Sequence, residues 1–332
     1  MTAPTTGEAI EGGLSLKNRR YGAGGSGFVN DWMIFFLVLS VFLLCSIFID
    51  RFFELGNMMN IMRQISFLAI VGLGQFFVIV LGHLDLSVGS AIGLYSVLMA
   101  GLVSRNDLPL LIAIALVLVL AAIVGLVNGL VTVIGKVPAF ITTLVMMNVL
   151  MGIAFLYSRG LPISGLPSGF NFLGMGYLFS VPVPIYLMLL IGVACYVFTM
   201  HTQMGRNFYA VGGNAEAARL SGISVRKITL IGFMLSSVFA AIGAIGLTSR
   251  TMAGTASLGE ALLFDVITVV VLGGTSLFGG RGNVVGVILA ALLIGIISNA
   301  MGLLGIDTYF QWIVKGTILI IVVLIDVNSK RT

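Results

Sequence analysis

The chain has 332 residues, of which 59% are hydrophobic and 9% are charged, and its formal net charge is +5. Soluble domains carry about a quarter charged residues, so this composition excludes a soluble globular protein and predicts an all-α, polytopic membrane protein. The apolar runs are continuous, whereas the strands of an outer-membrane barrel alternate in segments of about ten residues. The two cysteines, Cys45 and Cys195, lie inside apolar segments and predict neither a disulfide framework nor a metal site.

Residues 1–30 are polar and glycine-rich and are expected to form a flexible cytoplasmic lead. The apolar run from Trp32 to Ile49 begins late and ends without small residues, so we interpret it as a retained span and not as a signal peptide. Residues 31–332 then form one transmembrane domain of about ten helices. The other spans are expected near residues 61–81, 87–104, 109–134, 138–158, 183–200, 228–248, 263–278, 284–304 and 308–326.

The basic residues set the orientation. With the N-terminus inside, eleven of the 17 lysines and arginines fall in inner segments, five fall in outer segments and Lys315 falls within a span. This asymmetry follows the positive-inside rule, so the net charge reflects topology and does not indicate nucleic-acid binding. Both termini and the loop 201–227 are therefore predicted to lie on the cytoplasmic side of a lipid bilayer.

The loop 201–227 contains a short helix with its own start and stop signals. Asn214 is a good N-cap, and Glu216 in the first turn meets the positive end of the helix dipole. Arg219 lies in the last turn, and Gly222 can adopt the left-handed conformation that ends a helix. The predicted helix, 215–221, is too short to be stable alone in water, so it is expected to pack against something.

The two halves of the chain share a short pattern of Val, Leu and Gly. Residues 80–89 align with residues 271–280 at a constant offset of 191, and in both places a span runs into a glycine-rich break. Transporters often contain internal repeats with broken helices at corresponding positions. Chance matches are common in such a chain, so the repeat and a coincidence both remain open.

Four ordered motifs resemble the permease subunits of bacterial ABC importers for monosaccharides, the ribose, galactose, arabinose and xylose group. The resemblance covers about residues 30–326. The motifs are GHLDLSVGS at 82–90, NG at 128–129 with PAFITTL at 138–144, GRNFYAVGGN at 205–214 with AARLSG at 217–222, and GGTSL at 273–277 with GGRG at 279–282. His83 departs from the family pattern, which usually has glycine there, and a bulky side chain puts close backbone packing at that turn in doubt.

This resemblance implies an ABC importer permease fold in a bacterial inner membrane. It also implies three kinds of partner: a second permease copy, cytoplasmic ATP-binding subunits and a periplasmic sugar-binding protein. The loop helix would dock on the ATPase, because Glu216-Ala217-Ala218 with Gly222 fits the docking pattern of such permeases. An ordinary solvated loop helix is the alternative. The proposed docking residues are Gly212, Gly213, Asn214, Glu216, Ala217, Ala218, Arg219 and Gly222.

Polar residues inside the spans are candidates for the substrate pathway, since intramembrane polar groups are often functional. Asp85 can instead cap the next helix at Ser87 and Val88, which we favour. Asparagines in spans can hydrogen-bond sugar hydroxyls, but they also bridge neighbouring helices. Asp265 and Lys315 either pair with each other or lie at the membrane interfaces. The pathway candidates are Asp85, Ser87, Asn128, Asn148 and Asn299.

The chain carries no G-x-x-x-x-G-K-[ST] phosphate loop, so it is expected to be non-catalytic and to need no cofactor, with ATP hydrolysed by a partner. An ion-coupled secondary sugar transporter is the alternative function, but it would normally place several carboxylates in the middle of the membrane. The sequence does not name the sugar. Ribose, another pentose, a hexose and a cyclitol such as inositol all fit.

The predicted orientation can be tested by labelling. Ala210→Cys lies in the predicted cytoplasmic loop, and Gly165→Cys lies in a predicted outer loop. In intact cells, a membrane-impermeant maleimide should label position 165 at once and label position 210 only after the cells are opened. Labelling of both positions from the same side would overturn the ten-span topology.

Overall fold

The computed structural model describes residues 26–329, and nearly all of its elements are helices. The helices at the predicted spans are α1 (Ser26–Phe48), α2 (Leu55–Val80), α3 (Val88–Ser104), α4 (Leu110–Val133), α5 (Ala139–Ser158), α7 (Val183–His201), α10 (Val225–Thr251), α11 (Leu262–Leu272), α12 (Val284–Leu303) and α13 (Thr308–Ser329). The shorter elements are η1 (Ser168–Asn171), α6 (Phe172–Met175), β1 (Tyr177–Leu178), β2 (Val181–Pro182), α8 (Gln203–Gly213) and α9 (Ala215–Leu220).

Each predicted span contains a helix. Among residues 26–329, seven helices are long and apolar enough to cross a membrane, and α3, α11 and the described apolar part of α1 are shorter. The extent expected for the span at 263–278 is wrong, because α11 has only 11 residues and ends at Leu272. Gly274 then takes a φ of 85°, which leaves the helical conformation. Helix α1 begins at Ser26, within the predicted lead, and residues 1–25 lie outside the described part.

Helix α2 runs through the middle of the bundle. Every residue from Ile65 to Val80 is buried, so protein surrounds this part of the helix on all sides. Helices α7, α10, α11 and α12 pack around it. Small residues allow the closest approach, since a Cβ atom added at Gly74 would lie 2.7 Å from the Cβ atom of Phe239 on α10.

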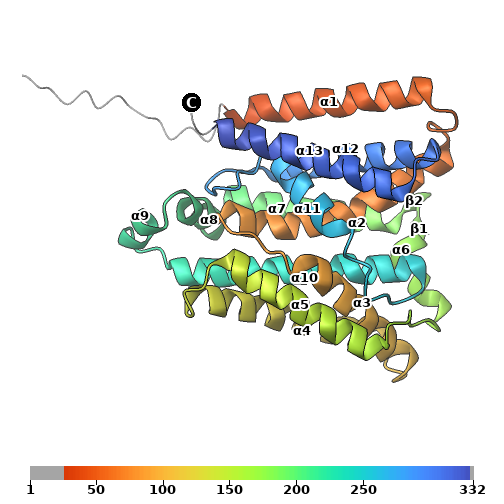
Figure 1. The fold of residues 1–332 in the computed structure, drawn as a ribbon, viewed down its shortest axis with the longest axis horizontal. Helices are drawn as coiled ribbons and strands as arrows, with labels where there is room; N and C mark the ends of the chain where they lie inside the picture. The colour runs from red at the N-terminus through yellow and green to blue at the C-terminus, as the bar shows by residue number, and fades with distance from the viewer. Residues whose placement is uncertain (1–25, 330–332) are drawn as a thin grey trace, which may run out of the picture.

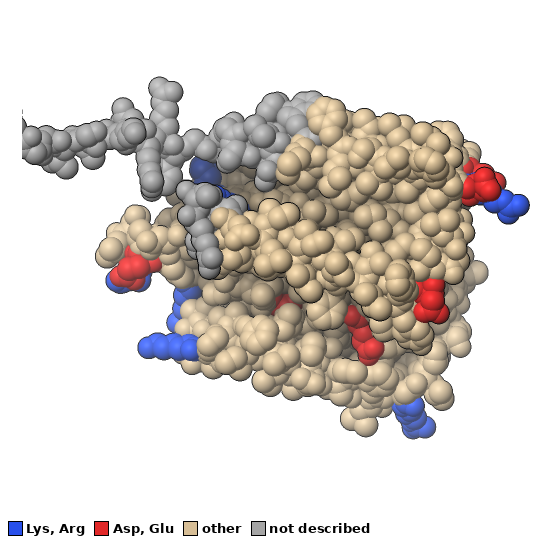
Figure 2. Space-filling model, turned by 45° about the horizontal axis from the view of Figure 1, so that its top comes forward, with Lys and Arg blue, Asp and Glu red and all other residues tan. Residues whose placement is uncertain are grey.

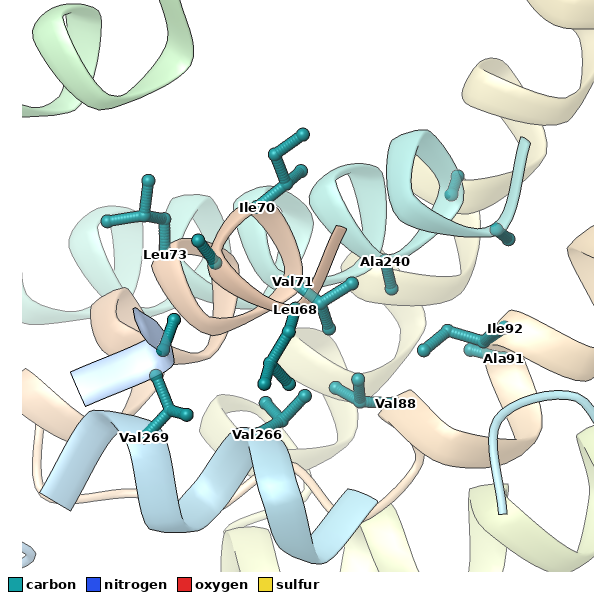
Figure 3. Packing of buried hydrophobic residues seen from close by; sticks show 14 of the residues in the cluster. Leu68, Ile70, Val71, Leu73, Val88, Ala91, Ile92, Ala240, Val266 and Val269 are labelled. Carbon is teal, nitrogen blue, oxygen red and sulfur yellow. The ribbon is translucent and has the colours of Figure 1, made fainter. Parts of the chain in front are cut away.

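The apolar core lies where α2 meets α3, α10 and α11. Figure 3 shows Leu68 of α2 close to Val266 of α11, with Val88 of α3 beside them. The outer helices α4, α5, α7 and α13 expose large apolar side chains. In Figure 2 most visible charged side chains lie towards the two ends of the bundle, and the surface between them is largely uncharged. This distribution is that of a protein whose sides face lipid.

Two breaks interrupt the helical bundle and lie against each other. The first break, residues 81–87, joins α2 to α3, and the second break, residues 273–283, joins α11 to α12. The Gly280 N–H donates to the Val80 carbonyl across 2.8 Å. The two segments that align in the sequence are therefore neighbours in space, and each of them ends a helix.

A small cap closes the end of the bundle opposite α8 and α9 (Figure 1). It consists of η1, α6 and the β1–β2 hairpin. The Ser249 hydroxyl of α10 donates to the Phe170 carbonyl at 2.5 Å and accepts from the Gly174 N–H at 2.7 Å. The Arg63 guanidinium of α2 lies 4.7 Å from the centre of the Tyr177 ring. This outer segment is thus fastened to the two central helices.

Helix α13 lies at the edge of the bundle and packs on α11. The Lys315 ammonium lies 2.7 Å from the Asp265 carboxylate of α11, and these side chains are 16% and 9% exposed. Asp265 and Lys315 are therefore a pair, one of the two alternatives left open by the sequence. Near its other end, the Asp326 carboxylate accepts the Leu277 N–H of the second break at 3.0 Å. The end of α13 and the start of α1 lie at the end of the bundle that carries α8 and α9 (Figure 1).

The ion pair between α11 and α13 gives a stability prediction. Lys315→Met leaves the buried Asp265 carboxylate without a cation, which should lower the free energy of unfolding by roughly 3 kcal/mol. The double variant Asp265→Leu/Lys315→Met should recover most of that loss, because no charge remains buried. Thermal unfolding of the purified protein measures both effects. Lys136→Met is the control, since Lys136 is exposed; a double variant no more stable than Lys315→Met would contradict the prediction.

Candidate docking helices and buried polar site

Helices α8 and α9 form a protruding pair at one end of the bundle (Figure 1). The N-cap of α8 is Thr202, whose hydroxyl accepts the Gly205 N–H at 3.0 Å. Asn214 ends α8 and begins α9, and its side chain accepts the Ala217 N–H at 2.9 Å. Gly222 takes a φ of 83° just after α9. The predicted N-cap and left-handed stop are therefore confirmed, and the helix ends at Leu220, one residue before the predicted end.

Most residues on the surface of α9 are small or charged and do not pack against the rest of the protein. Ala218 is 5% exposed and faces the protein, while Glu216, Ala217 and Arg219 are exposed. Leu220 is 74% exposed, an apolar side chain on an otherwise polar helix. Such a surface can pack small residues into a groove of another protein and place an apolar contact beside them.

Glu216 and Arg219 form a two-point ion pair within α9. The Arg219 guanidinium contacts the carboxylate at 3.0 Å through Nε and at 2.5 Å through Nη2. The Arg219 guanidinium holds the pKa of Glu216 below its usual value, and the carboxylate raises the pKa of Arg219. Both groups are therefore charged at neutral pH. Because they are exposed, they can change partners at an interface with little loss of internal stability.

Helix α8 was not predicted from the sequence. Its inner face consists of Gly205, Phe208 and Val211, which are buried, and half of its other residues are polar. The Phe208 ring lies 5.3 Å from the Phe77 ring of α2. Two sequence signals could have revealed α8. The three buried residues recur at every third position, and a threonine stands just before the helix.

Three of the pathway candidates meet in one buried cluster. The Asp85 carboxylate accepts the Ser87 N–H at 3.0 Å and the Ser87 hydroxyl at 2.5 Å, and its other oxygen accepts the Ser236 hydroxyl of α10 at 3.0 Å. The Asn128 amide of α4 donates to the Ser87 hydroxyl at 2.9 Å. The expected cap at Ser87 and Val88 is confirmed only in part: Asp85 accepts the N–H of Ser87, the N-cap residue of α3, but no side chain caps the helix itself. The cluster ties the first break to α4 and α10.

The other two pathway candidates lie elsewhere and differ in their surroundings. Asn299 of α12 and Asn57 of α2 exchange two hydrogen bonds, at 2.9 and 2.7 Å, so Asn299 bridges two helices. Asn148 lies on the outward face of α5 and is exposed, and its amide donates to the Leu144 carbonyl at 3.0 Å. The structure therefore separates Asn148 from the four candidates that bond within the bundle.

His83 does not prevent close packing at the first break. Gly82 takes a φ of 76°, and a Cβ atom added there would lie 3.2 Å from the Phe278 carbonyl oxygen of the second break. The half-buried His83 imidazole instead stacks on the Phe233 ring of α10, with ring centres 6.1 Å apart. Gly82 makes the close backbone contact, and the larger side chain is accommodated beside it.

Comparison with known proteins gives a consistent family. The profile of the family described as "Branched-chain amino acid transport system / permease component" matches residues 57–323. The ribose import permease protein RbsC of Haemophilus influenzae is 38% identical over 90% of this chain and 94% of the relative. The protein of the same name from Bacillus subtilis is 40% identical over 88% of this chain and 90% of the relative.

A third relative carries a different sugar in its name. The galactose/methyl galactoside import permease protein MglC of Escherichia coli K12 is 34% identical over 88% of this chain and 92% of the relative. No solved structure matches the chain with significance. Since the profile covers most of the chain, and relatives above 30% identity align over nearly their full length, the chain belongs to this family of transport-system permease components.

Proposed function

We propose that this chain is the membrane subunit of an ATP-driven importer in the bacterial inner membrane and forms the path for a monosaccharide or cyclitol. A periplasmic binding protein would deliver the sugar, and separate ATP-binding subunits would supply the energy. The observation that carries the proposal is the protruding α8–α9 pair on a multi-span helical bundle. An ion-coupled transporter would have no need of such an external docking helix.

The relatives favour a sugar as the substrate. Two relatives that align over most of this chain are named for ribose import and one for galactose or methyl galactoside import. The family description mentions branched-chain amino acids, but the relatives cited above are named as sugar permeases. D-ribose is therefore the first candidate, followed by other pentoses, hexoses and cyclitols such as inositol.

The docking face consists of the exposed residues around α9. Glu216 and Arg219 would supply charged contacts, Ala217 would allow close approach, and Asn214 and Gly222 would fix the two ends of the helix. Ala218 faces inward and supports this surface from within. With the ATPase on that side, the start of α1 and the end of α13 would also be cytoplasmic, as the distribution of basic residues indicates.

Charge reversal on α9 tests the docking face. Glu216→Lys should cost only about 0.3–1 kcal/mol locally through the helix dipole. It should nevertheless reduce co-purification of the ATP-binding subunits at least about tenfold, because it reverses a charge at an interface. Gly222→Val should act in the same direction, since a β-branched residue resists the left-handed conformation there. Permease-dependent ATP hydrolysis should fall in parallel.

Glu54→Lys is a matched control for this experiment. Glu54 also has an arginine three residues away, because Arg51 Nε lies 3.9 Å from its carboxylate, and both side chains are exposed. It belongs to the loop between α1 and α2, which lies at the end of the bundle opposite α8 and α9 (Figure 1). Glu54→Lys should leave assembly with the ATP-binding subunits unchanged. If Glu216→Lys and Gly222→Val assemble and hydrolyse ATP like the parent, α9 is not the docking element.

A second copy of the chain would complete the pathway along the outward face of α5. Asn148 lies in the middle of α5 and is exposed, and Gly152, one turn further along, has no atom within 4 Å of an added Cβ. A polar side chain in mid-span is costly against lipid, so it is expected to face protein or a water-filled path. Asp85, Ser87, Asn128 and Asn299 bond within the bundle in this conformation, so we assign the pathway first to Asn148.

Cross-linking tests whether two α5 helices face each other. In a chain with Cys45 and Cys195 replaced by alanine, Asn148→Cys should form a disulfide-linked dimer on mild oxidation in membranes. Leu190→Cys on α7 is the control, because Leu190 is 69% exposed and α7 packs on α2 and α12, whereas α5 packs on α3 and α4. A monomer for both variants, or equal dimer formation by both, would refute the α5 interface.

A further inference from the structure

A cluster of five glycines lies where the first break, the second break and the end of α8 come together. Gly82 belongs to the first break, Gly279 and Gly280 belong to the second, and Gly212 and Gly213 end α8. We call this contact the glycine junction. It joins the proposed docking helices to both breaks through main-chain atoms alone.

At Gly212, Gly279 and Gly280 the contacts of the glycine junction leave no room for a side chain, whereas a Cβ atom added at Gly213 would meet no atom within 4 Å. A Cβ atom added at Gly212 would overlap the Val80 carbonyl oxygen and lie 2.7 Å from the Gly280 nitrogen. One added at Gly280 would lie 2.7 Å from the Gly213 Cα atom. The Gly280 N–H donates to the same Val80 carbonyl at 2.8 Å. Main-chain atoms in direct contact cannot absorb a displacement by changing rotamers, as a layer of side chains can.

A side-chain bond reinforces the junction from α8. The Tyr209 hydroxyl donates to the Gly282 carbonyl of the second break at 3.2 Å. Burial raises the pKa of Tyr209 to about 12, so the hydroxyl keeps its proton at physiological pH. Two consecutive turns of α8 thus hold the second break, one through the hydroxyl and one through the glycines.

Beyond the junction, each break is bonded to an outer helix. The Thr143 hydroxyl of α5 shares its proton between the Ala139 carbonyl of its own helix, at 2.9 Å, and the Leu84 carbonyl of the first break, at 3.1 Å. The Asp326 carboxylate of α13 accepts the Leu277 N–H of the second break at 3.0 Å. A shift of the breaks would therefore move α5, whose outward face carries Asn148, as well as α13.

We propose that the glycine junction passes the displacement of α8 and α9 to both breaks, and through the first break to α5. The inference rests on the proposed function, because the displacement would come from the bound ATPase. The competing route runs along the chain, from α8 and α9 into α7 and α10. Only the first route needs the contacts at the glycine junction to transmit the displacement once the ATPase has bound.

The mildest test removes one hydroxyl. Tyr209→Phe deletes the bond to Gly282, together with the hydrogen bond between the Tyr209 hydroxyl and Thr199 of α7, and adds no atom to the junction. Tyr196→Phe is the matched control, because its ring contacts His201 on α7, away from the junction. Gly212→Ala is the stronger variant, since its methyl group would separate α8 from Val80. Its control is Gly302→Ala, where an added Cβ has no atom within 4 Å.

The measurement uses the complete complex with its ATP-binding subunits in proteoliposomes. The chain carries Asn148→Cys, with Cys45 and Cys195 replaced by alanine. The rate at which a water-soluble maleimide labels position 148 is compared without nucleotide and with ATP plus vanadate. Co-purification of the ATP-binding subunits and the rate of ATP hydrolysis are measured in the same preparations.

Tyr209→Phe should reduce the nucleotide-dependent change in labelling about fivefold, the factor expected for one hydrogen bond. Its ATP hydrolysis and its assembly with the ATPase should match the parent, and both control variants should behave like the parent throughout. Gly212→Ala, where it assembles, should abolish the change. If Tyr209→Phe and an assembled Gly212→Ala both keep the parental change, the junction does not transmit the displacement. If the parent itself fails to assemble or hydrolyse ATP, the proposed function fails instead.

Discussion

The fold depends on how two interrupted helices satisfy their main-chain hydrogen bonds inside a bundle that lipid surrounds. An unpaired N–H or C=O group in such a place costs several kcal/mol, which is why irregular backbone must be covered by protein. Here the second break is bonded to the end of α2, where the first break begins, because the Gly280 N–H donates to the Val80 carbonyl. Side chains supply further hydrogen-bond partners for the main chain of the breaks: Thr143 bonds to the Leu84 carbonyl, and Asp326 accepts the Leu277 N–H. The main-chain hydrogen bonds of the breaks therefore depend partly on α5 and α13.

The central helices are held together in a different way. Between α3 and α10, hydroxyl groups pair with each other: Tyr95 with Ser237 at 2.6 Å, and Thr248 with Ser96 at 2.7 Å. With glycine and alanine between them, these helices approach closely and leave few polar atoms without partners. Helix α10 therefore lies at the centre, packed against both α2 and α3. Helix α5 packs on α3 and α13 packs on α11, and each of these outer helices also contacts one of the breaks.

Much of this architecture could be predicted because bilayer thickness dictates the length of an apolar helix. Continuous apolar runs located the helices at the ten predicted spans, and the caps of α9 followed from local residue chemistry at Asn214 and Gly222. What escaped prediction depends on tertiary contact. The end of α11 at Leu272 follows from packing of the second break against the first. Helix α8 is short and polar and is stabilised mainly by its buried face around Phe208, and the outer cap depends on its bonds to Ser249 of α10.

For the candidate site too, the sequence predicted some features, while others depend on tertiary contacts. Residue type alone marked Asp85, Asn128, Asn148 and Asn299 as unusual in spans, but it could not show which of them face outward. That distinction depends on helix rotation, which places Asn299 against Asn57 and leaves Asn148 on the surface of α5. The glycines that join α8 to the breaks had also been noted, and only their meeting in space shows what they have in common.

The ion pair between α11 and α13 has a consequence for how the protein is made. A lysine at the centre of an isolated helix opposes insertion by about 2.5–3.5 kcal/mol, and α11, with 11 residues, is too short to cross the hydrocarbon core alone. Because Lys315 is neutralised by Asp265, the last helices enter the membrane most favourably as a group. We therefore expect α11 and α13 to be integrated together and not one at a time.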